Sequence, residues 1–213
     1  MKILFFGDSI TDMGRAREGN HPAMKMGVGY PNLIASELTF ACPTKYEIVN
    51  RGISGNRIVD LYARIKADVW NEQPDVLSIL IGVNDVWHEI GGKNGVELDR
   101  FERIYRMLLE DTKKQLPNVR LILCEPFVLR GEATDGEGRW EAFCAVREYA
   151  AAVKMLAAEQ GATFVPLQTA FDEAAAKYGA EYYLYDGVHP APAGARLIAN
   201  EWMKAFAALE KER

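Results

Sequence analysis

The chain has 213 residues, a length that suits a single globular domain over positions 1–213. Apolar residues make up 49% of it and charged residues 26%, the balance of a water-soluble protein that can bury a sizeable core. The net charge of −5 argues against a nucleic-acid partner and against a polybasic membrane anchor.

Short apolar runs alternate with longer amphipathic stretches along the chain. Five of these runs are predicted as strands: "ILFF" (3–6), "YEIVN" (46–50), "DVLSILIG" (75–82), "VRLILCE" (119–125) and "TFVPL" (163–167). The third and fourth are almost wholly apolar, which is typical of strands covered by helices on both faces.

Apolar residues recur at helical spacing between the strands. Helices are predicted over about 30–41, 56–70, 98–116, 140–160, 169–178 and 192–209. The predicted loops are 13–28 and 129–139. The second loop has three glycines among polar residues, so it is a candidate for a mobile flap.

The alternation of strands and helices favours right-handed crossovers and a parallel sheet. We therefore expect an α/β protein, a three-layer α/β/α sandwich with a flavodoxin-like five-stranded parallel sheet in the order 2-1-3-4-5. Ligands bind at the carboxyl ends of the strands in such sheets. Residues that directly follow the strands are therefore the first candidates for a functional site.

The cysteines bear on the compartment in which the protein works. Cys42, Cys124 and Cys144 are odd in number and widely spaced, which indicates reduced thiols rather than a disulfide framework. The first apolar run is shorter than the core of a signal peptide, and no run approaches the roughly 20 residues of a membrane span. We therefore expect a cytoplasmic protein with no membrane contact.

Polar residues follow the predicted strands in a pattern that suggests chemistry. Ser9 comes shortly after the first strand, Gly55 after the second and Asn84 after the third. Asp186 and His189 lie just before the last predicted helix. All five are therefore expected on one rim of the sheet.

This set meets the needs of ester hydrolysis by a serine nucleophile. A serine hydroxyl needs a neighbouring base, and a histidine base needs a carboxylate to orient it. Asp186 and His189 are close enough in sequence for one loop turn to bring them together. The backbone N–H groups of Ser9 and Gly55 and the amide of Asn84 can donate to an oxyanion. Each residue alone is more often a turn or cap residue, so the prediction rests on their combination.

Four segments, "FFGDSITD", "NRGISGN", "IGVNDVW" and "DGVHP", resemble the sequence blocks of the SGNH hydrolases, also called the GDSL esterase/lipase family. They extend from residue 5 to residue 190, so the resemblance covers nearly the whole chain. It implies a flavodoxin-like fold and ester hydrolysis without metal or cofactor. By position it assigns Ser9 as the nucleophile, His189 as the base and Asp186 as the acidic partner of the base. It also assigns Ser9, Gly55 and Asn84 to the oxyanion hole.

Flanking stretches such as "LYDGVHPAPAGARLIA" look most like intracellular bacterial acetyl esterases that act on carbohydrates, including acetylxylan esterases. This likeness implies removal of O-acetyl groups from sugars or oligosaccharides, and association into a homo-oligomer. Trp87 and Tyr185 are candidate substrate-binding residues because aromatic faces suit sugar rings. Such aromatic side chains are about as often part of the core or of a subunit contact.

Several other functions stay open on the sequence alone. The same chemistry could serve a lysophospholipase, a thioesterase or a short-chain aryl esterase. Asp8, Asp12, Asp85 and His88 could instead hold metal ions in a phosphohydrolase, and Cys124 could be a nucleophile. A non-catalytic carbohydrate-binding module is a further alternative. Neither "GDSIT" nor "GISGN" fits the Gly-x-Ser-x-Gly motif of the α/β-hydrolases.

Overall fold

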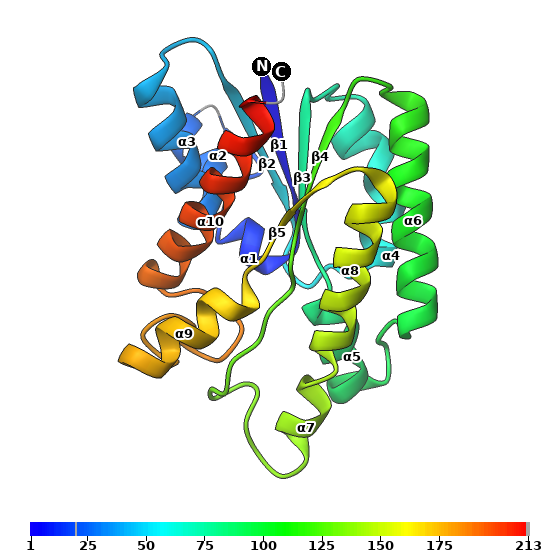
Figure 1. The fold of residues 1–213 in the computed structure, drawn as a ribbon, viewed down its shortest axis with the longest axis vertical. Helices are drawn as coiled ribbons and strands as arrows, with labels where there is room; N and C mark the ends of the chain where they lie inside the picture. The colour runs from blue at the N-terminus through cyan, green and yellow to red at the C-terminus, as the bar shows by residue number, and fades with distance from the viewer. Residues whose placement is uncertain (20, 212–213) are drawn as a thin grey trace.

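The computed structural model describes residues 1–19 and 21–211, and these form a five-stranded sheet between two layers of helices (Figure 1). The strands are β1 (Lys2–Gly7), β2 (Glu47–Gly52), β3 (Val76–Leu80), β4 (Arg120–Cys124) and β5 (Thr163–Val165). They are parallel throughout, in the order β2-β1-β3-β4-β5. The predicted three-layer fold and strand order are therefore confirmed.

The helices cover both faces of the sheet. They are α1 (Ser9–Asp12), α2 (Pro22–Met26), α3 (Tyr30–Ala41), α4 (Ile58–Ile65), the π-helical turn η1 (Lys66–Trp70), α5 (Val83–Gly92), α6 (Leu98–Gln115), α7 (Arg139–Phe143), α8 (Val146–Gln160), α9 (Gln168–Tyr178) and α10 (Pro192–Lys211). Helices α3 and α10 pack together on one face, and α4, α6 and α8 on the other (Figure 1).

The central strands form the core because their side chains are buried on both faces. Every residue of β3 is buried, and β1 is buried from Ile3 onward. The indole of Trp202 in α10 packs on Phe5 and donates to the Ser78 hydroxyl at 2.9 Å, so even the polar side chain inside β3 has a partner.

Some predicted boundaries are wrong, for local backbone reasons. The strand predicted over 75–82 ends at Leu80, because Gly82 takes a positive φ of +137° and turns the chain into α5. The strand predicted over 163–167 ends before Pro166, which has no N–H to donate to a ladder.

The predicted helices also differ in detail from the observed ones. The stretch 56–70 changes from α- to π-helix after Ile65, and 140–160 is divided between α7 and α8. Helix α2 lies inside the predicted loop 13–28, and neither α1 nor α5 was predicted. Helices α1 and α2 have only four and five residues, too few to show a helical period in the sequence.

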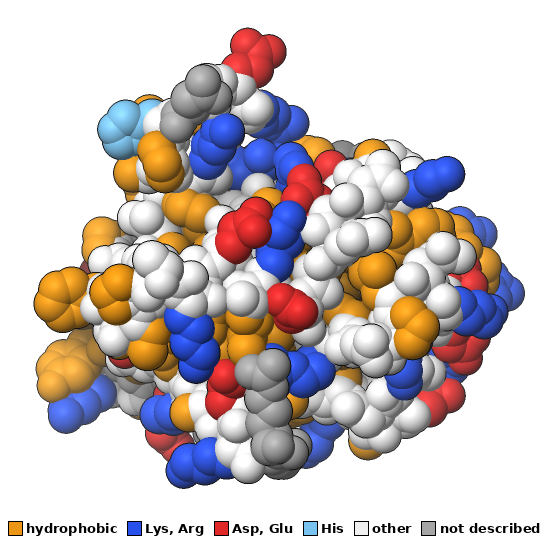
Figure 2. Space-filling model, turned by 90° about the horizontal axis from the view of Figure 1, so that it is seen from above, with side chains coloured by type: hydrophobic (Ala, Val, Ile, Leu, Met, Phe, Trp, Pro, Cys, Tyr) orange, Lys and Arg blue, Asp and Glu red, His pale blue; other side chains and the backbone are white. Residues whose placement is uncertain are grey.

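The carboxyl ends of the strands meet at the end of the molecule where α1 and α5 begin (Figure 1). Figure 2 views the opposite end, where basic and acidic side chains are intermingled over the visible face. Among residues 1–19 and 21–211, no helix combines the length and the apolar character that crossing a membrane requires.

Candidate active site

A sharp turn at the end of β1 places Ser9. The side chain of Asp8 caps α1, with its Oδ1 accepting from the Ile10 backbone N–H at 2.9 Å. Gly7 permits the turn because a Cβ there would lie 2.5 Å from the Leu80 carbonyl oxygen. Ser9 therefore stands at the first position of α1, at the predicted rim of the sheet.

His189 reaches Ser9 from near the other end of the chain. Its Nε2 lies 2.9 Å from Ser9 Oγ, and its Nδ1 lies 2.6 Å from Asp186 Oδ2. The other oxygen, Asp186 Oδ1, accepts from the backbone N–H groups of Val188 at 2.9 Å and of His189 at 2.7 Å. The Asp186 carboxylate therefore stabilises the turn over 186–189 with one oxygen and orients the His189 imidazole with the other.

These contacts shift the pKa values of His189 and Asp186 in opposite directions. The hydrogen bond with Asp186 raises the pKa of His189 above its ordinary value, although burial opposes it. Burial alone would raise the pKa of Asp186, but hydrogen bonds from His189 and from backbone amides outweigh burial and lower it. The pair therefore stabilises an imidazolium beside a carboxylate, which is the state of a general base after it has taken a proton.

Gly55 and Asn84 lie beside each other at the same rim. The Asn84 Nδ2 donates to the carbonyl of Asn56 at 3.1 Å, so the side chain is fixed against the loop that carries Gly55. An amide has two N–H donors, so this bond leaves one for a ligand. Gly55 has a φ of +81°, a conformation that glycine adopts without strain.

The two predicted substrate-binding residues flank the imidazole. The ring of Tyr185 stacks on His189 with centroids 5.8 Å apart and planes 18° apart, and 58% of Tyr185 is exposed. The Trp87 ring also lies 5.8 Å from His189, and it packs edge-on against Phe143. Both aromatic side chains therefore border the reactive group.

The loop over 129–139 is tied at its base to the acidic residue of the site. The Leu129 N–H donates to the Gly187 carbonyl and the Ala133 N–H to the Asp186 carbonyl, both at 2.9 Å. These bonds fix the first part of the loop. Movement of the remainder as a flap stays a prediction.

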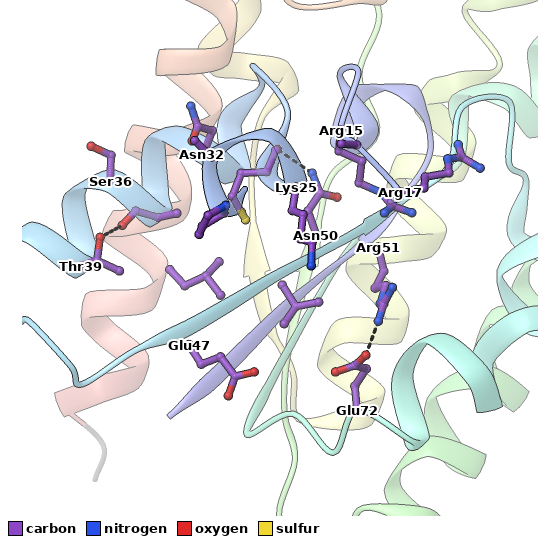
Figure 3. A pocket seen from close by; sticks show the side chains of 17 residues that line it. Arg15, Arg17, Lys25, Asn32, Ser36, Thr39, Glu47, Asn50, Arg51 and Glu72 are labelled. Carbon is purple, nitrogen blue, oxygen red and sulfur yellow. Dashed lines mark hydrogen bonds and ion pairs between the residues drawn. The ribbon is translucent and has the colours of Figure 1, made fainter. Parts of the chain in front are cut away.

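A cavity of about 610 Å³ lies elsewhere, between α2, α3 and the outer edge of β2 (Figure 3). Its lining carries four cationic side chains and two carboxylates: Arg15, Arg17, Lys25, Arg51, Glu47 and Glu72. None of the five predicted catalytic and oxyanion-hole residues lines this cavity. The candidate active site is therefore defined by its converging functional groups, which lie outside this cavity.

Comparison with known proteins gives the family. Residues 5–197 match the GDSL-like lipase/acylhydrolase family. The chain belongs to this family. The resemblance predicted from the four sequence segments is thereby confirmed, and the chain is a carboxylic ester hydrolase.

Similar GDSL-family proteins include an acetylxylan esterase of Geobacillus stearothermophilus, 36% identical over 95% of this chain and 92% of that protein. Its crystal structure superposes with a TM-score of 0.84, covering 96% of this chain and 93% of that one. A Parabacteroides merdae protein assigned as a GDSL-like lipase is 42% identical, with a TM-score of 0.89 over 96% of this chain and 94% of that one.

Two carboxyl groups are buried beneath the GDSL-family site, Asp8 beside Ser9 and Asp85 beside Asn84. Each has one oxygen bonded to a backbone amide, Asp8 to Ile10 and Asp85 to Ile58 at 3.0 Å. Within the described residues, the second oxygen of each is buried without a hydrogen-bond partner. Burial raises the pKa of Asp8 to about 7 and that of Asp85 well above its ordinary value.

We expect Asp8→Asn to change how stability depends on pH. The pKa of Asp8 rises from 3.8 to about 7 on folding, so between these values the folded state holds a proton that the unfolded state has lost. Wild-type stability should therefore fall as pH rises through this window. Relative to wild type, Asp8→Asn should gain about 2–3 kcal/mol between pH 5 and pH 8. Urea denaturation at both pH values measures this; parallel pH curves for the two proteins would contradict it.

Three of the four residues that could instead hold metal ions, Asp8, Asp12 and Asp85, accept hydrogen bonds within the chain. Within residues 1–19 and 21–211, no three His, Cys, Asp or Glu side chains form a group that could hold a metal ion. Asp12 instead accepts hydrogen bonds from Ser54 and Arg17.

Cys124, the alternative nucleophile, is fully buried. Burial raises the pKa of its thiol to about 12, so it is a poor nucleophile.

Proposed function

We propose that this chain is a serine esterase that removes short acyl groups, acetyl above all, from sugars or oligosaccharides such as acetylated xylo-oligosaccharides. The observation that carries the proposal is the continuous hydrogen-bond chain from Ser9 Oγ through His189 to Asp186. The acetylated-sugar substrate is supported by the acetylxylan esterase relative and by the aromatic rings of Trp87 and Tyr185 beside His189.

Acylation follows from the geometry of these groups. His189 Nε2 takes the proton of Ser9 Oγ as the oxygen attacks the ester carbonyl, and Asp186 stabilises the imidazolium. The developing oxyanion accepts from the backbone N–H groups of Ser9 and Gly55 and from the Asn84 amide. The imidazolium then returns its proton to the sugar oxygen, which leaves as an alcohol.

Deacylation repeats these steps with water. His189 takes a proton from a water molecule, which attacks the acyl carbonyl held on Ser9. The oxyanion forms against the same donors and collapses as the Ser9 oxygen leaves and recovers its proton from His189. Acetate is released and the enzyme returns to its starting state.

An acyl-length panel tests the substrate class. We expect kcat/KM to be highest for acetyl esters and to fall roughly tenfold by the butyryl ester, since each added methylene must fit the acyl site. Nitrophenyl esters of increasing length, a lysophospholipid and an acyl thioester are compared with an acetylated xylo-oligosaccharide. Acetate release from the sugar is measured directly.

The panel separates the proposed activity from others of the same chemistry. A preference for long acyl chains would favour a lysophospholipase, and a preference for the thioester a thioesterase. Nitrophenyl acetate hydrolysis without acetate release from the sugar would favour a short-chain aryl esterase. Binding of the oligosaccharide without turnover of any ester would indicate a carbohydrate-binding protein.

A further inference from the structure

Two proposed oxyanion donors, the N–H groups of Ser9 and Gly55, lie on separate segments of the chain. Ser9 begins α1 after β1, and Gly55 lies in the loop between β2 and α4. Donors of this kind work only when their positions relative to the reacting carbonyl are held closely. The structure must therefore contain contacts that fix one segment against the other.

Asp12 provides such a contact. It is the last residue of α1, three positions after Ser9, and only 6% of its side chain is exposed. Its Oδ2 accepts from the Ser54 backbone N–H at 3.0 Å and from the Ser54 hydroxyl at 3.1 Å. Ser54 directly precedes Gly55, so this carboxylate joins the helix of the nucleophile to the neighbour of the oxyanion glycine.

The remaining bonds of Asp12 hold the carboxylate in place. Arg17 Nη2 donates to Oδ2 at 3.1 Å, and the Arg15 backbone N–H donates to Oδ1 at 3.2 Å. Both oxygens therefore act as acceptors only. An asparagine cannot reproduce this arrangement, because its NH₂ group would face a donor in either orientation of the amide.

The packing around α1 leaves little room for it to move. A Cβ on Gly52 would lie 2.3 Å from the Asp12 backbone nitrogen, so α1 rests directly on the end of β2. The Asn50 side chain also donates to the Thr11 carbonyl at 2.7 Å. Because α1 is firmly seated on β2, the Asp12 carboxylate is a fixed anchor for the loop.

A second anchor lies on the other side of Gly55. Arg64 Nε donates to Asn56 Oδ1 at 2.7 Å. This bond reaches the side chain of Asn56, while the Asn84 amide binds the Asn56 carbonyl at 3.1 Å and the Asn56 N–H donates to the Ile53 carbonyl at 3.2 Å. The loop is therefore held on both sides of Gly55, and Asp12 provides the contact to the main chain at Ser54, the residue whose peptide bond carries the Gly55 N–H.

We propose that Asp12 is a positioning residue for ester hydrolysis: its carboxylate sets the Gly55 N–H against Ser9 by holding Ser54. This inference rests on the proposed roles of Ser9 and Gly55. Asp12 touches no reacting atom. Its loss should therefore weaken binding of the tetrahedral intermediate while leaving the nucleophile and base in place.

The test measures nitrophenyl acetate turnover by Asp12→Asn and Asp12→Ala. The concentration of active sites is first titrated with a serine-reactive fluorophosphonate, so that kcat refers only to correctly folded sites. We expect kcat per site to fall roughly 10- to 100-fold, with KM changed less than about threefold. Affinity for a trifluoromethyl ketone, which forms a tetrahedral adduct on the serine, should fall in parallel.

Two further variants complete the design. Arg106→Gln removes an ion pair with Glu159 between α6 and α8, outside the contacts of Asp12, and its kcat should stay within about threefold of wild type. Ser54→Ala removes one donor from the loop side, should lower kcat by about 3- to 10-fold, and decides the question if the Asp12 variants do not fold. Asn84→Ala serves as the reference for a lost oxyanion donor.

The outcomes separate this inference from the proposed function. Wild-type kcat per site in Asp12→Asn, or lower kcat with unchanged affinity for the trifluoromethyl ketone, would overturn the positioning role. A merely structural role would reduce the fraction of titratable sites and leave kcat per site unchanged, which also overturns it. Full activity in Ser9→Ala would instead overturn the proposed function.

Discussion

Ser9→Ala is expected to lower kcat for ester hydrolysis by at least about 10⁴-fold, because it removes the only atom that forms the proposed acyl-enzyme. The fold should survive. The Ser9 hydroxyl contacts His189, whereas α1 is capped by the side chain of Asp8. Nitrophenyl acetate turnover, circular dichroism and thermal melting measure both parts of this expectation.

Ser36→Ala is the matched control for this experiment. Ser36 is an exposed serine on α3, away from the candidate site, so its variant should hydrolyse the ester at the wild-type rate. Ser9→Ala should also fail to react with a fluorophosphonate. If the Ser9 variant keeps near wild-type turnover, the nucleophile has been wrongly assigned.

Asp186→Asn is expected to lower kcat by about 10⁴-fold through the wrong tautomer of His189. The amide oxygen can still accept from the Val188 and His189 backbone amides, so the loop should keep its shape. The amide NH₂ would then face His189 Nδ1, which would have to become an acceptor. In that tautomer Nε2 carries the proton and cannot take another from Ser9.

The pH profile gives a second measure of the same pair. His189 must be neutral to act as a base, and its pKa is raised by Asp186, so the acid limb of kcat/KM in the wild type should lie above pH 6.5. In Asp186→Asn the acid limb of the residual kcat/KM should lie at lower pH, because the carboxylate that raises the pKa of His189 is gone. The control is Asp99→Asn, at an exposed residue in the first turn of α6, which should leave both the rate and the acid limb unchanged.

The sequence predicted the sheet well because the buried strands of a parallel sheet have a strong local signature. Val76–Leu80 is apolar apart from Ser78, and Arg120–Cys124 is apolar after its first residue, so both could be predicted as buried strands. Ser9, Gly55 and Asn84 could be predicted because each lies within a few residues of the end of a strand, whereas Asp186 and His189 were predicted from their spacing before the last helix. The positions of Ser9, Gly55 and Asn84 required only the topology, not the side-chain packing.

Other features of the site depend on contacts that the sequence does not reveal. The bond between Asp12 and Ser54 joins residues 42 positions apart, and an acidic residue one turn after the nucleophile is its only local sign. The raised pKa of Asp8 is likewise hidden from the sequence, because burial sets it and burial emerges only in the fold. Cytoplasmic location and homo-oligomer formation stay predictions, because no contact within the described residues bears on either.

The hydrogen bond between Ser9 and His189 spans 180 positions of the chain. During synthesis Ser9 is therefore made long before His189. A chain that ends before His189 carries the serine without its general base. Such long-range closure is among the slow steps of folding, because the entropy of joining distant segments must be overcome first. Recovery of esterase activity during refolding should therefore measure when the segment with His189 docks beside Ser9. Chains truncated before His189 should not hydrolyse esters.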